Sequence, residues 1–466
     1  MKKAILLHCN PDEHCIAAEV QLIKKYESTY VIDSVNLNKL TGHLHPDAKL
    51  RDYFYEKFDS KYNRFIKINI NGKDLTRKIQ YIPIEIKAPG NISELRKIKI
   101  NDVSIGLAAL STAASYSKCV SENAEDYGEY LKEALNVASI SYSIGISLAK
   151  RKYDMAIIFN GRFAISRPIA EILRKITNAN ILYYEFDDKR MQLMESLNST
   201  FIPEEFSKRI LTVDNFDCKL ANDFFMMKER KTWNEIERKI RSKQVIGKFP
   251  NDLLNKKYIV FFTSSPDEYF AINDNINLAE EFVTQYDFAL ELAQKSILQN
   301  YSYVIRMHPN LRFKHKSWEK QWNFQKLEEL KCKIIWPESE IDTYEILKKA
   351  HIVFTAGSTI GIEAAYFKKL IANVGKSLAT YLGCAVEINT KKDLEHFISN
   401  PYIIKDSFES ALACGQYFSN QNDLQLEIKY LNNIAIIDGK IISRSKFIVA
   451  KLKLIKLKIG KYKLLF

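Results

Sequence analysis

Apolar runs alternate with amphipathic stretches along most of the chain, and this alternation predicts an α/β fold. The first residues indicate a strand over 4–8, a helix over 15–26 and a second strand over 30–35. A further strand, helix and strand follow over 155–184. Because consecutive strands joined by a helix usually pair in parallel, the first half of the chain predicts a doubly wound layer.

The same alternation begins again in the second half, after a strongly charged stretch at 215–257. We therefore predict three parts, which are residues 1–250, residues 251–438 and a short basic tail at 439–466. The first two are expected to be doubly wound, Rossmann-like domains that face a central cleft. The expected strands of the second domain are 258–262, 303–306, 333–336, 352–354 and 370–373.

Composition indicates a folded protein without long disordered linkers, since 46% of the 466 residues are hydrophobic and 27% are charged. The seven cysteines form no CxxC pair, which is typical of a reducing compartment. The apolar run at 4–7 is too short for the core of a signal peptide, and there is no run of about 18 apolar residues to span a bilayer. We therefore expect a cytoplasmic protein.

Positive charge is concentrated in the tail. The net charge is +13, and residues 439–466 carry nine Lys or Arg and no acid, which leaves +4 on the other residues. A nearly balanced body argues against a nucleic-acid groove. The alternation of Lys with Leu and Ile at 451–459 fits either an edge strand protected by lysines or peripheral binding to the anionic inner face of the cell membrane. In the second case, deleting 451–466 is expected to release the protein from anionic vesicles, and unchanged binding would refute it.

A glycine turn follows the expected strand at 352–354 and opens into an amphipathic stretch. Backbone N–H groups and hydroxyls converge at such a junction, so we predict that Gly357, Ser358 and Thr359 hold a phosphate. Glu363 lies four residues after Thr359 and does not match the three-residue spacing of a capping box, so its carboxylate is a candidate ligand for sugar hydroxyls. The alternative is that Ser358 and Thr359 only cap the helix.

Polar side chains also end other strands of the second domain. Arg306 and His308 lie at the end of one predicted strand, and Pro309 fixes the backbone after them. An imidazole in this place can donate to a phosphate oxygen and, when protonated, offset charge on a departing nucleotide, although a lone histidine is often structural. A further polar cluster, which either contacts the donor or forms a turn, contains Ser264, Ser265 and Glu268.

The first domain offers groups for an acceptor at the ends of its strands. Glu185 is the predicted general base, because a carboxylate can remove the proton of an acceptor hydroxyl, and Asp187 and Asp188 are the alternatives. Asn160 and Arg162 follow the preceding strand and, together with Asp187 and Asp188, are expected to bind the acceptor. Acidic residues after strands are also common in solvated turns. Because metal-capable side chains do not recur at ligand spacing, no metal is predicted.

Several short segments together resemble bacterial capsule and surface-polysaccharide glycosyltransferases of the GT-B fold. The pairing of His-Pro with a later Ser-Thr is also similar to bacterial sialyltransferases and to the glycerophosphotransferases of teichoic acid synthesis, whose donors are CMP- or CDP-linked. In the sialyltransferases the base belongs to an acidic motif that ends in glycine, and the counterpart at 185–188 lacks that glycine. The segments that carry the resemblance are 160–162, 262–268, 306–310, 336–344 and 357–364.

This resemblance implies a membrane-associated glycosyltransferase that moves a sugar from a nucleotide-activated donor, with a CMP-linked donor favoured, to a capsular or other surface polysaccharide. The implied partners are the nucleotide sugar, an oligosaccharide or lipid-linked glycan acceptor and an anionic membrane surface, without nucleic acid, metal or cofactor. Three alternatives remain open. They are a polyol-phosphate transferase, a UDP-sugar 2-epimerase of similar architecture and a non-catalytic scaffold of a polysaccharide assembly complex.

Overall fold

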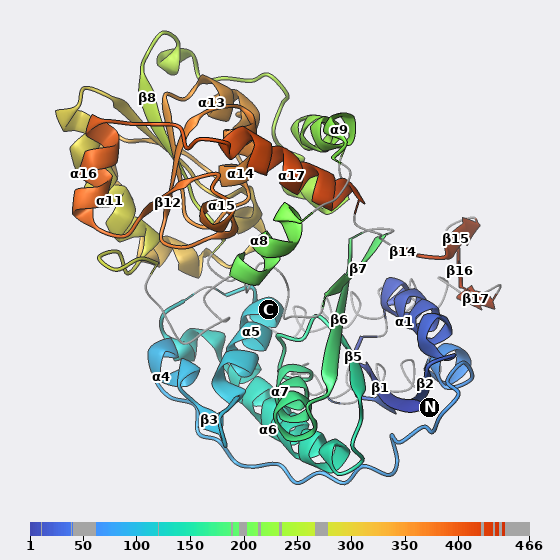
Figure 1. The fold of residues 1–466 in the computed structure, drawn as a ribbon. Helices are drawn as coiled ribbons and strands as arrows, with labels where there is room; N and C mark the ends of the chain where they lie inside the picture. The colour runs from blue at the N-terminus through green and yellow to red at the C-terminus, as the bar shows by residue number, and fades with distance from the viewer. Residues whose placement is uncertain are drawn as a thin grey trace, which may run out of the picture.

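The computed structural model has two α/β lobes, one above the other in Figure 1. Each lobe is built on a six-stranded sheet. The predicted α/β, GT-B-like fold with two doubly wound domains is therefore confirmed. The structure describes residues 1–10, 12–38, 40, 62–119, 121–187, 190–194, 203–212, 216–232, 235–265, 278–420, 424–431, 434–437 and 440–442.

The sheet of the N-terminal lobe has the order β14-β7-β6-β5-β1-β2. The last four strands pair in parallel, β7 pairs antiparallel with β6, and β14 pairs antiparallel with β7. In β1, Ile5 and Leu7 join one buried cluster, whereas Ala4 and Leu6 join another. Side chains alternate along a strand, so both faces of this sheet are covered. Its strands are β1 (Lys2–His8), β2 (Tyr30–Asn36), β5 (Met155–Phe159), β6 (Asn180–Asp187), β7 (Arg190–Met194) and β14 (Leu424–Gln425).

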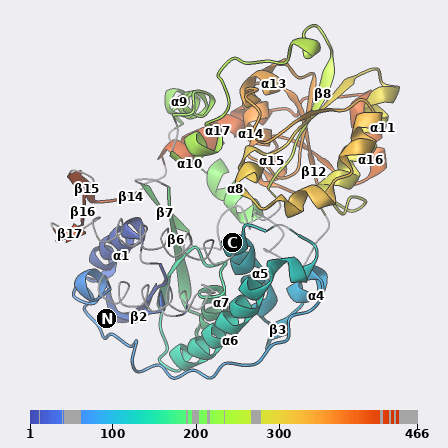
Figure 2. The same ribbon diagram turned by 180° about the vertical axis from the view of Figure 1, so that it is seen from behind.

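Helices of this lobe gather around its sheet, and Figures 1 and 2 show α5, α6 and α7 side by side. A short antiparallel hairpin of β3 (Lys99–Ile100) and β4 (Val103–Ser104) precedes α5. The helices are α1 (Glu13–Tyr26), the π-helical turn η1 (Tyr62–Ile66), α4 (Ile92–Arg96), α5 (Ile105–Ser117), the 3₁₀ turn η2 (Ala124–Tyr127), α6 (Glu129–Ala149) and α7 (Arg167–Thr177).

The sheet of the C-terminal lobe is parallel throughout, with the order β10-β9-β8-β11-β12-β13. Counted along the chain within this lobe, the order is 3-2-1-4-5-6, which is that of the Rossmann fold. The order reverses between β8 and β11. The strands are β8 (Tyr258–Phe262), β9 (Ser302–Arg306), β10 (Lys333–Ile335), β11 (Ile352–Thr355), β12 (Leu370–Val374) and β13 (Val386–Ile388).

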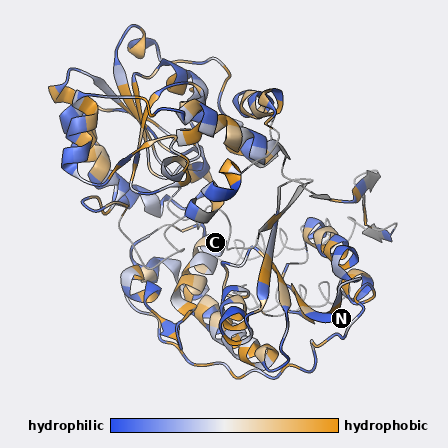
Figure 3. Ribbon diagram, in the orientation of Figure 1, coloured by the Kyte–Doolittle hydropathy of each residue, from blue (hydrophilic) through white to orange (hydrophobic). Residues whose placement is uncertain are grey.

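Two buried clusters cover the two faces of this second sheet. Ile259 and Phe261 of β8 pack with α11 and α16, whereas Tyr258 and Val260 pack with α13, α14 and α17. Figure 3 shows the hydrophobic positions concentrated on the strands and the inner helix faces of both lobes. The helices are η3 (Asn251–Leu253), α11 (Gln285–Leu298), η5 (Pro309–Phe313), η6 (Lys316–Gln321), α12 (Phe324–Glu329), α13 (Thr343–Lys349), α14 (Ile360–Tyr366), α15 (Leu378–Tyr381), α16 (Lys391–Ser399) and α17 (Ser407–Asn420).

The charged segment before residue 250 packs on the C-terminal lobe, although we predicted it as the end of the first domain. It forms α8 (Pro203–Leu211), α9 (Cys218–Glu229) and α10 (Glu235–Ile240). Phe224 and Phe225 of α9 are buried in the same cluster as Tyr258 of β8. Figure 1 shows α9 beside α17. The apolar face of α9 outweighs the charges around it and fixes the segment to the second sheet.

The chain then crosses back to the N-terminal lobe through β14, which pairs with β7, and Leu426 and Ile437 join the N-terminal core. A small antiparallel sheet follows, made of β15 (Ile428–Leu431), β16 (Ile434–Ile437) and β17 (Lys440–Ile442). Residues 443–466 lie outside the described residues, so the prediction for the basic tail stays untested. Among the described residues, no helix is both long and apolar enough to cross a bilayer.

Candidate functional site

A cavity of about 260 Å³ lies at the carboxyl ends of β8, β9 and β11. Phe262 and Thr263 line it from β8, Arg306 and His308 from β9, and residues after β11 complete this side. Because β8 and β11 are the neighbours at which the strand order reverses, the cavity occupies the place where doubly wound sheets bind their ligands. The fold thus identifies this cavity as the candidate ligand site.

The cavity brings together five of the predicted donor-site residues, which come from two different strand ends and the following helix. Ser264 and Ser265 lie beside it and are buried, and the Ser264 hydroxyl donates a hydrogen bond to the Ala356 carbonyl. Glu268 lies outside the described residues. The five residues that line the cavity are Arg306, His308, Ser358, Thr359 and Glu363.

Arg306 is almost fully buried, with 1% of its surface exposed. Its Nη1 donates to the carbonyls of Ile335, at 3.4 Å, and Trp336, at 2.5 Å. Among the residues that the structure describes, its Nε and Nη2 have no hydrogen-bond partner. Burial, together with the charge of Arg241, lowers the pKa of Arg306 to about 10, so the side chain is still a cation at neutral pH. A buried cation whose N–H groups lack acceptors destabilises the folded protein, and it favours the binding of an anion.

His308 caps the 3₁₀ turn η5 and is half-buried. Its Nδ1 accepts a hydrogen bond from the backbone N–H of Asn310 at 3.3 Å, and its own backbone N–H donates to the Thr263 hydroxyl at 2.8 Å. In the neutral ring this bonding assigns the proton to Nε2. His308 therefore lines the cavity with an imidazole that is oriented by its neighbours and that carries a donor N–H.

Glu363 does not have the free carboxylate that we expected. Its Oε1 accepts from Lys228 Nζ at 2.5 Å and from the Thr359 hydroxyl at 3.3 Å, and its Oε2 accepts from the Tyr344 hydroxyl at 2.5 Å. Burial raises the pKa of Glu363, but the charge and hydrogen bond of Lys228 outweigh burial and hold this pKa below its ordinary value. Glu363 therefore lines the cavity as an ionised carboxylate, and both of its oxygens already accept hydrogen bonds from the protein.

The glycine turn itself is less open to a ligand than its sequence suggests. Thr359 commits its hydroxyl to Glu363, and α14 has only seven residues, too few for a strong helix dipole. The Ser358 Oγ accepts from the Ile360 N–H at 3.4 Å, which leaves the Ser358 O–H proton as a donor. No capping box forms at Thr359, as predicted from the spacing of Glu363. The positive charge that could attract an anion therefore comes more from charged side chains around the turn than from its backbone N–H groups.

Replacing Gly357 with alanine is expected to destabilise the turn only moderately. Gly357 has a φ of +81°, which side chains rarely adopt, but a Cβ there would meet nothing within 4 Å. The expected cost is therefore conformational, about 1–2 kcal/mol. Chemical denaturation measures it. A loss above about 4 kcal/mol would show instead that the position is closely packed.

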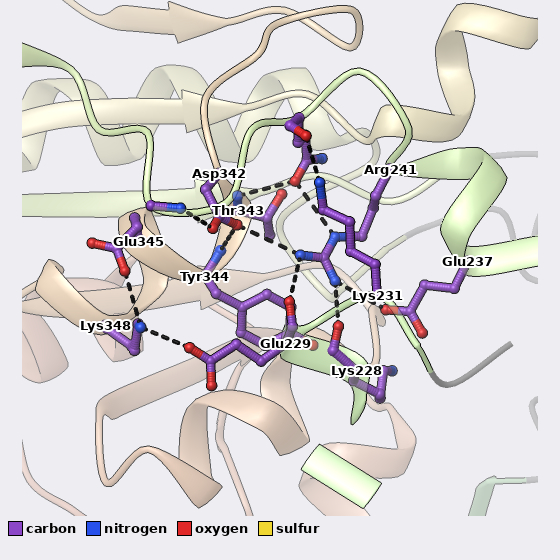
Figure 4. A network of polar contacts seen from close by, with 12 residues as sticks. Lys228, Glu229, Lys231, Glu237, Arg241, Asp342, Thr343, Tyr344, Glu345 and Lys348 are labelled. Carbon is purple, nitrogen blue, oxygen red and sulfur yellow. Dashed lines mark hydrogen bonds and ion pairs between the residues drawn. The ribbon is translucent and has the colours of Figure 1, made fainter. Parts of the chain in front are cut away.

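A network of polar residues from α9 and α10 forms the other wall of the cavity, and it was not predicted (Figure 4). The Arg241 guanidinium lies 4.5 Å from the centre of the Tyr344 ring and 3.5 Å from Asp342 Oδ1, and it donates to the Lys228 carbonyl at 2.6 Å. Asp342 in turn caps α13. Tyr344 stands in the segment at 336–344 that carries the resemblance, but it was not among the predicted site residues. Charged residues such as Lys228 and Arg241 are normally solvated and gave no signal.

Asn160, Arg162 and Glu185 do not line this cavity, and in the described part of the chain none of its lining residues belongs to the N-terminal lobe. Asn160 and Glu185 are brought together at the ends of β5 and β6, where the Asn160 amide donates to Glu185 Oε1. Arg162 lies with its guanidinium 4.9 Å from the centre of the Phe163 ring. The role of Glu185 as the base stays a prediction.

The strand that carries Glu185 is longer than predicted. We expected it to end at residue 184, but β6 continues to Asp187 because β7 pairs with it antiparallel. Glu185 is therefore a residue within the strand, opposite Gln192, and does not follow the strand. The side chain of Asp187 and the whole of Asp188 lie outside the described part of the chain.

No family model matches the chain, and no curated protein matches it. Among solved structures, it is similar to the KpsC beta Kdo 2,7 transferase of Thermosulfurimonas dismutans, with 15% identity over 68% of this chain and 89% of that chain and a TM-score of 0.37. It is also similar to a UDP-GlcNAc 2-epimerase from Neisseria meningitidis bound to UDP-GlcNAc, with 13% identity over 90% of this chain and 97% of that chain and a TM-score of 0.31. A third is the glycosyltransferase SnogD from Streptomyces nogalater, with 8% identity over 90% of this chain and 96% of that chain and a TM-score of 0.26. These values are too low to assign a function.

Proposed function

We propose that the protein is a glycosyltransferase whose C-terminal lobe binds a nucleotide-activated sugar. One observation carries the proposal, namely the cavity at the reversal point of the parallel sheet. It is lined by His308 and by a buried Arg306, two of whose nitrogens have no hydrogen-bond partner among the described residues. Cationic and N–H donor groups at this position suit the phosphate of a nucleotide donor. A CMP-linked donor and a bacterial capsular or surface polysaccharide as product are the finer parts of the proposal.

In the proposed reaction, His308 acts on the departing nucleotide. As the bond between the sugar carbon and the phosphate oxygen breaks, Nε2–H donates to that oxygen, while Arg306 offsets the phosphate charge. The acceptor hydroxyl forms the new bond to the same carbon and gives its proton to Glu185 of the N-terminal lobe. The charge on the leaving phosphate is carried by side chains, so the reaction is proposed to proceed without a metal.

Product analysis tests the proposal and separates it from its alternatives. The purified full chain is incubated with CMP-, UDP- and CDP-linked donors, with and without a polysaccharide acceptor fraction. A transferase gives an extended glycan and free nucleotide only when the acceptor is present. An epimerized nucleotide sugar without acceptor, transfer of glycerol phosphate from CDP-glycerol, or no turnover at all would each contradict sugar transfer.

A further inference from the structure

The guanidinium of Arg306 is held in place through Nη1, whereas the edge that carries Nε and Nη2 is not hydrogen-bonded to the described residues. Nη1 donates to the carbonyls of Ile335 and Trp336, which are carried by β10 and the residue after it, so the plane of the group is set by the sheet. Nε and Nη2, which lie along one edge, are the two nitrogens without partners. Thr343 lines the same cavity, and its buried hydroxyl also has no partner among the described residues.

Asp342 and Glu338 are the acids whose charges act on Arg306. Asp342 pairs with Arg241 and caps α13, and Glu363 pairs with Lys228. Within the described part of the chain, Arg306 itself forms no ion pair. The positive charge of Arg241 repels that of Arg306 and lowers the pKa of Arg306 further. The charges of Asp342 and Glu338 offset this buried cation only in part, because burial and Arg241 outweigh them.

We propose that the Nε and Nη2 edge of Arg306, with the Thr343 hydroxyl as a third donor, binds an oxyanion of the ligand through two of its oxygens. Parallel N–H groups on one edge of a guanidinium match the paired oxygens of a phosphate or a carboxylate. The inference rests on the proposed function, because the oxyanion is part of the nucleotide-activated donor. It is either the nucleotide's phosphate or an acidic group on the transferred sugar, and both present the same chemistry.

Titration calorimetry of Arg306→Lys against wild type tests this inference, with pyrophosphate, CMP, UMP and the matching nucleosides as probes. Lysine keeps the charge but cannot offer two parallel N–H groups. If the edge binds the nucleotide's phosphate, the variant is expected to bind CMP or UMP about 10- to 100-fold more weakly, with no change for the nucleosides. If it binds an acidic sugar, nucleotide affinity is unchanged and KM rises by a similar factor only for donors whose sugar carries a carboxylate.

Two further measurements separate a ligand role from a structural one. Thr343→Val removes the third donor but keeps the shape of the side chain, and it is expected to weaken the same probe by less than Arg306→Lys does. Arg306→Met, without ligand, is expected to be no less stable than wild type, because it removes a buried charge that is only partly offset. A residue that only held the carbonyls of Ile335 and Trp336 would instead lower stability when replaced.

The inference would be overturned if wild type and Arg306→Lys bound every nucleotide and used every nucleotide sugar within twofold of each other. It would also be overturned if wild type bound none of the probes and used no nucleotide sugar whose sugar carries a carboxylate. Arg306-dependent binding of pyrophosphate or a nucleotide, without sugar transfer by wild type, would leave the inference standing and reject the proposed function. Sugar transfer that is unchanged in Arg306→Lys would support the proposed function and reject the inference about Arg306.

Discussion

Replacing His308 with alanine is expected to lower kcat for sugar transfer by about 10²- to 10⁴-fold. The imidazole lines the cavity beside Arg306 and is oriented by the Asn310 N–H, so its loss removes the donor to the departing nucleotide. The fold should be retained, because the ring is half-buried and caps a short 3₁₀ turn. Steady-state kinetics with a saturating donor measure the change.

His315 provides a matched control for this substitution. It caps the next 3₁₀ turn, η6, and its Nδ1 accepts from the Ser317 N–H at 3.3 Å, the same distance as for His308 and Asn310. It does not line the cavity. His315→Ala should therefore change stability about as much as His308→Ala does while kcat is kept. Near-normal turnover in His308→Ala, or an equal loss in both variants, would reject the role of His308.

Replacing Lys228 with methionine is expected to destabilise the protein by about 3–5 kcal/mol, because it leaves a buried carboxylate without its cation. The Nζ of Lys228 lies 2.5 Å from Glu363 Oε1, and the two side chains are 13% and 5% exposed. Denaturant unfolding that follows the C-terminal lobe measures the loss. The ion pair of Lys248 with Glu340 has the same 2.5 Å separation but is about half exposed, so Lys248→Met is expected to have only a small effect.

Removing the carboxylate as well should recover most of this loss. In the double variant Lys228→Met with Glu363→Gln, no buried charge is left alone. The pKa of Glu363 is lowered by the fold, so its ionised form contributes stability above the unfolded pKa of about 4.3, and this contribution is lost as pH falls through the folded pKa. The penalty of Glu363→Gln alone should accordingly shrink in acid. A loss below about 1 kcal/mol for Lys228→Met would show that Lys228 does not stabilise Glu363.

The residues that sequence could identify are those placed by the parallel sheet. His308 and Ser358 follow apolar strands, and the carboxyl ends of parallel strands lie on one edge, so their convergence in one cavity follows from the strand pattern. The alternation of strands and helices is enough to place both residues at the same edge of the sheet, although they are far apart in the sequence.

The missed part of the site depends on packing between distant segments. Lys228 lies more than a hundred residues before Glu363, and it reaches this acid because Phe224 and Phe225 anchor α9 in the core of the second lobe. In the sequence, those two aromatic residues stand within the charged stretch at 215–257, which we predicted as the boundary between the two domains. Packing between distant segments also explains why the prediction of a free Glu363 carboxylate was wrong. Its spacing from Thr359 correctly excluded a capping box, but the sequence could not reveal that Lys228 of another helix pairs with it.

Titration calorimetry of CMP, CDP, UMP, UDP and their nucleotide sugars into the full chain tests most directly whether the cavity binds a nucleotide donor. We expect at least one of them to bind with a stoichiometry of one and to stabilise the protein, by about 2.7 kcal/mol when the free ligand is at 100 times its Kd. The Arg306→Lys variant should lose affinity for this ligand or for its sugar donor. Absence of binding by wild type for every nucleotide and nucleotide sugar at millimolar concentration would contradict a donor site in the C-terminal lobe.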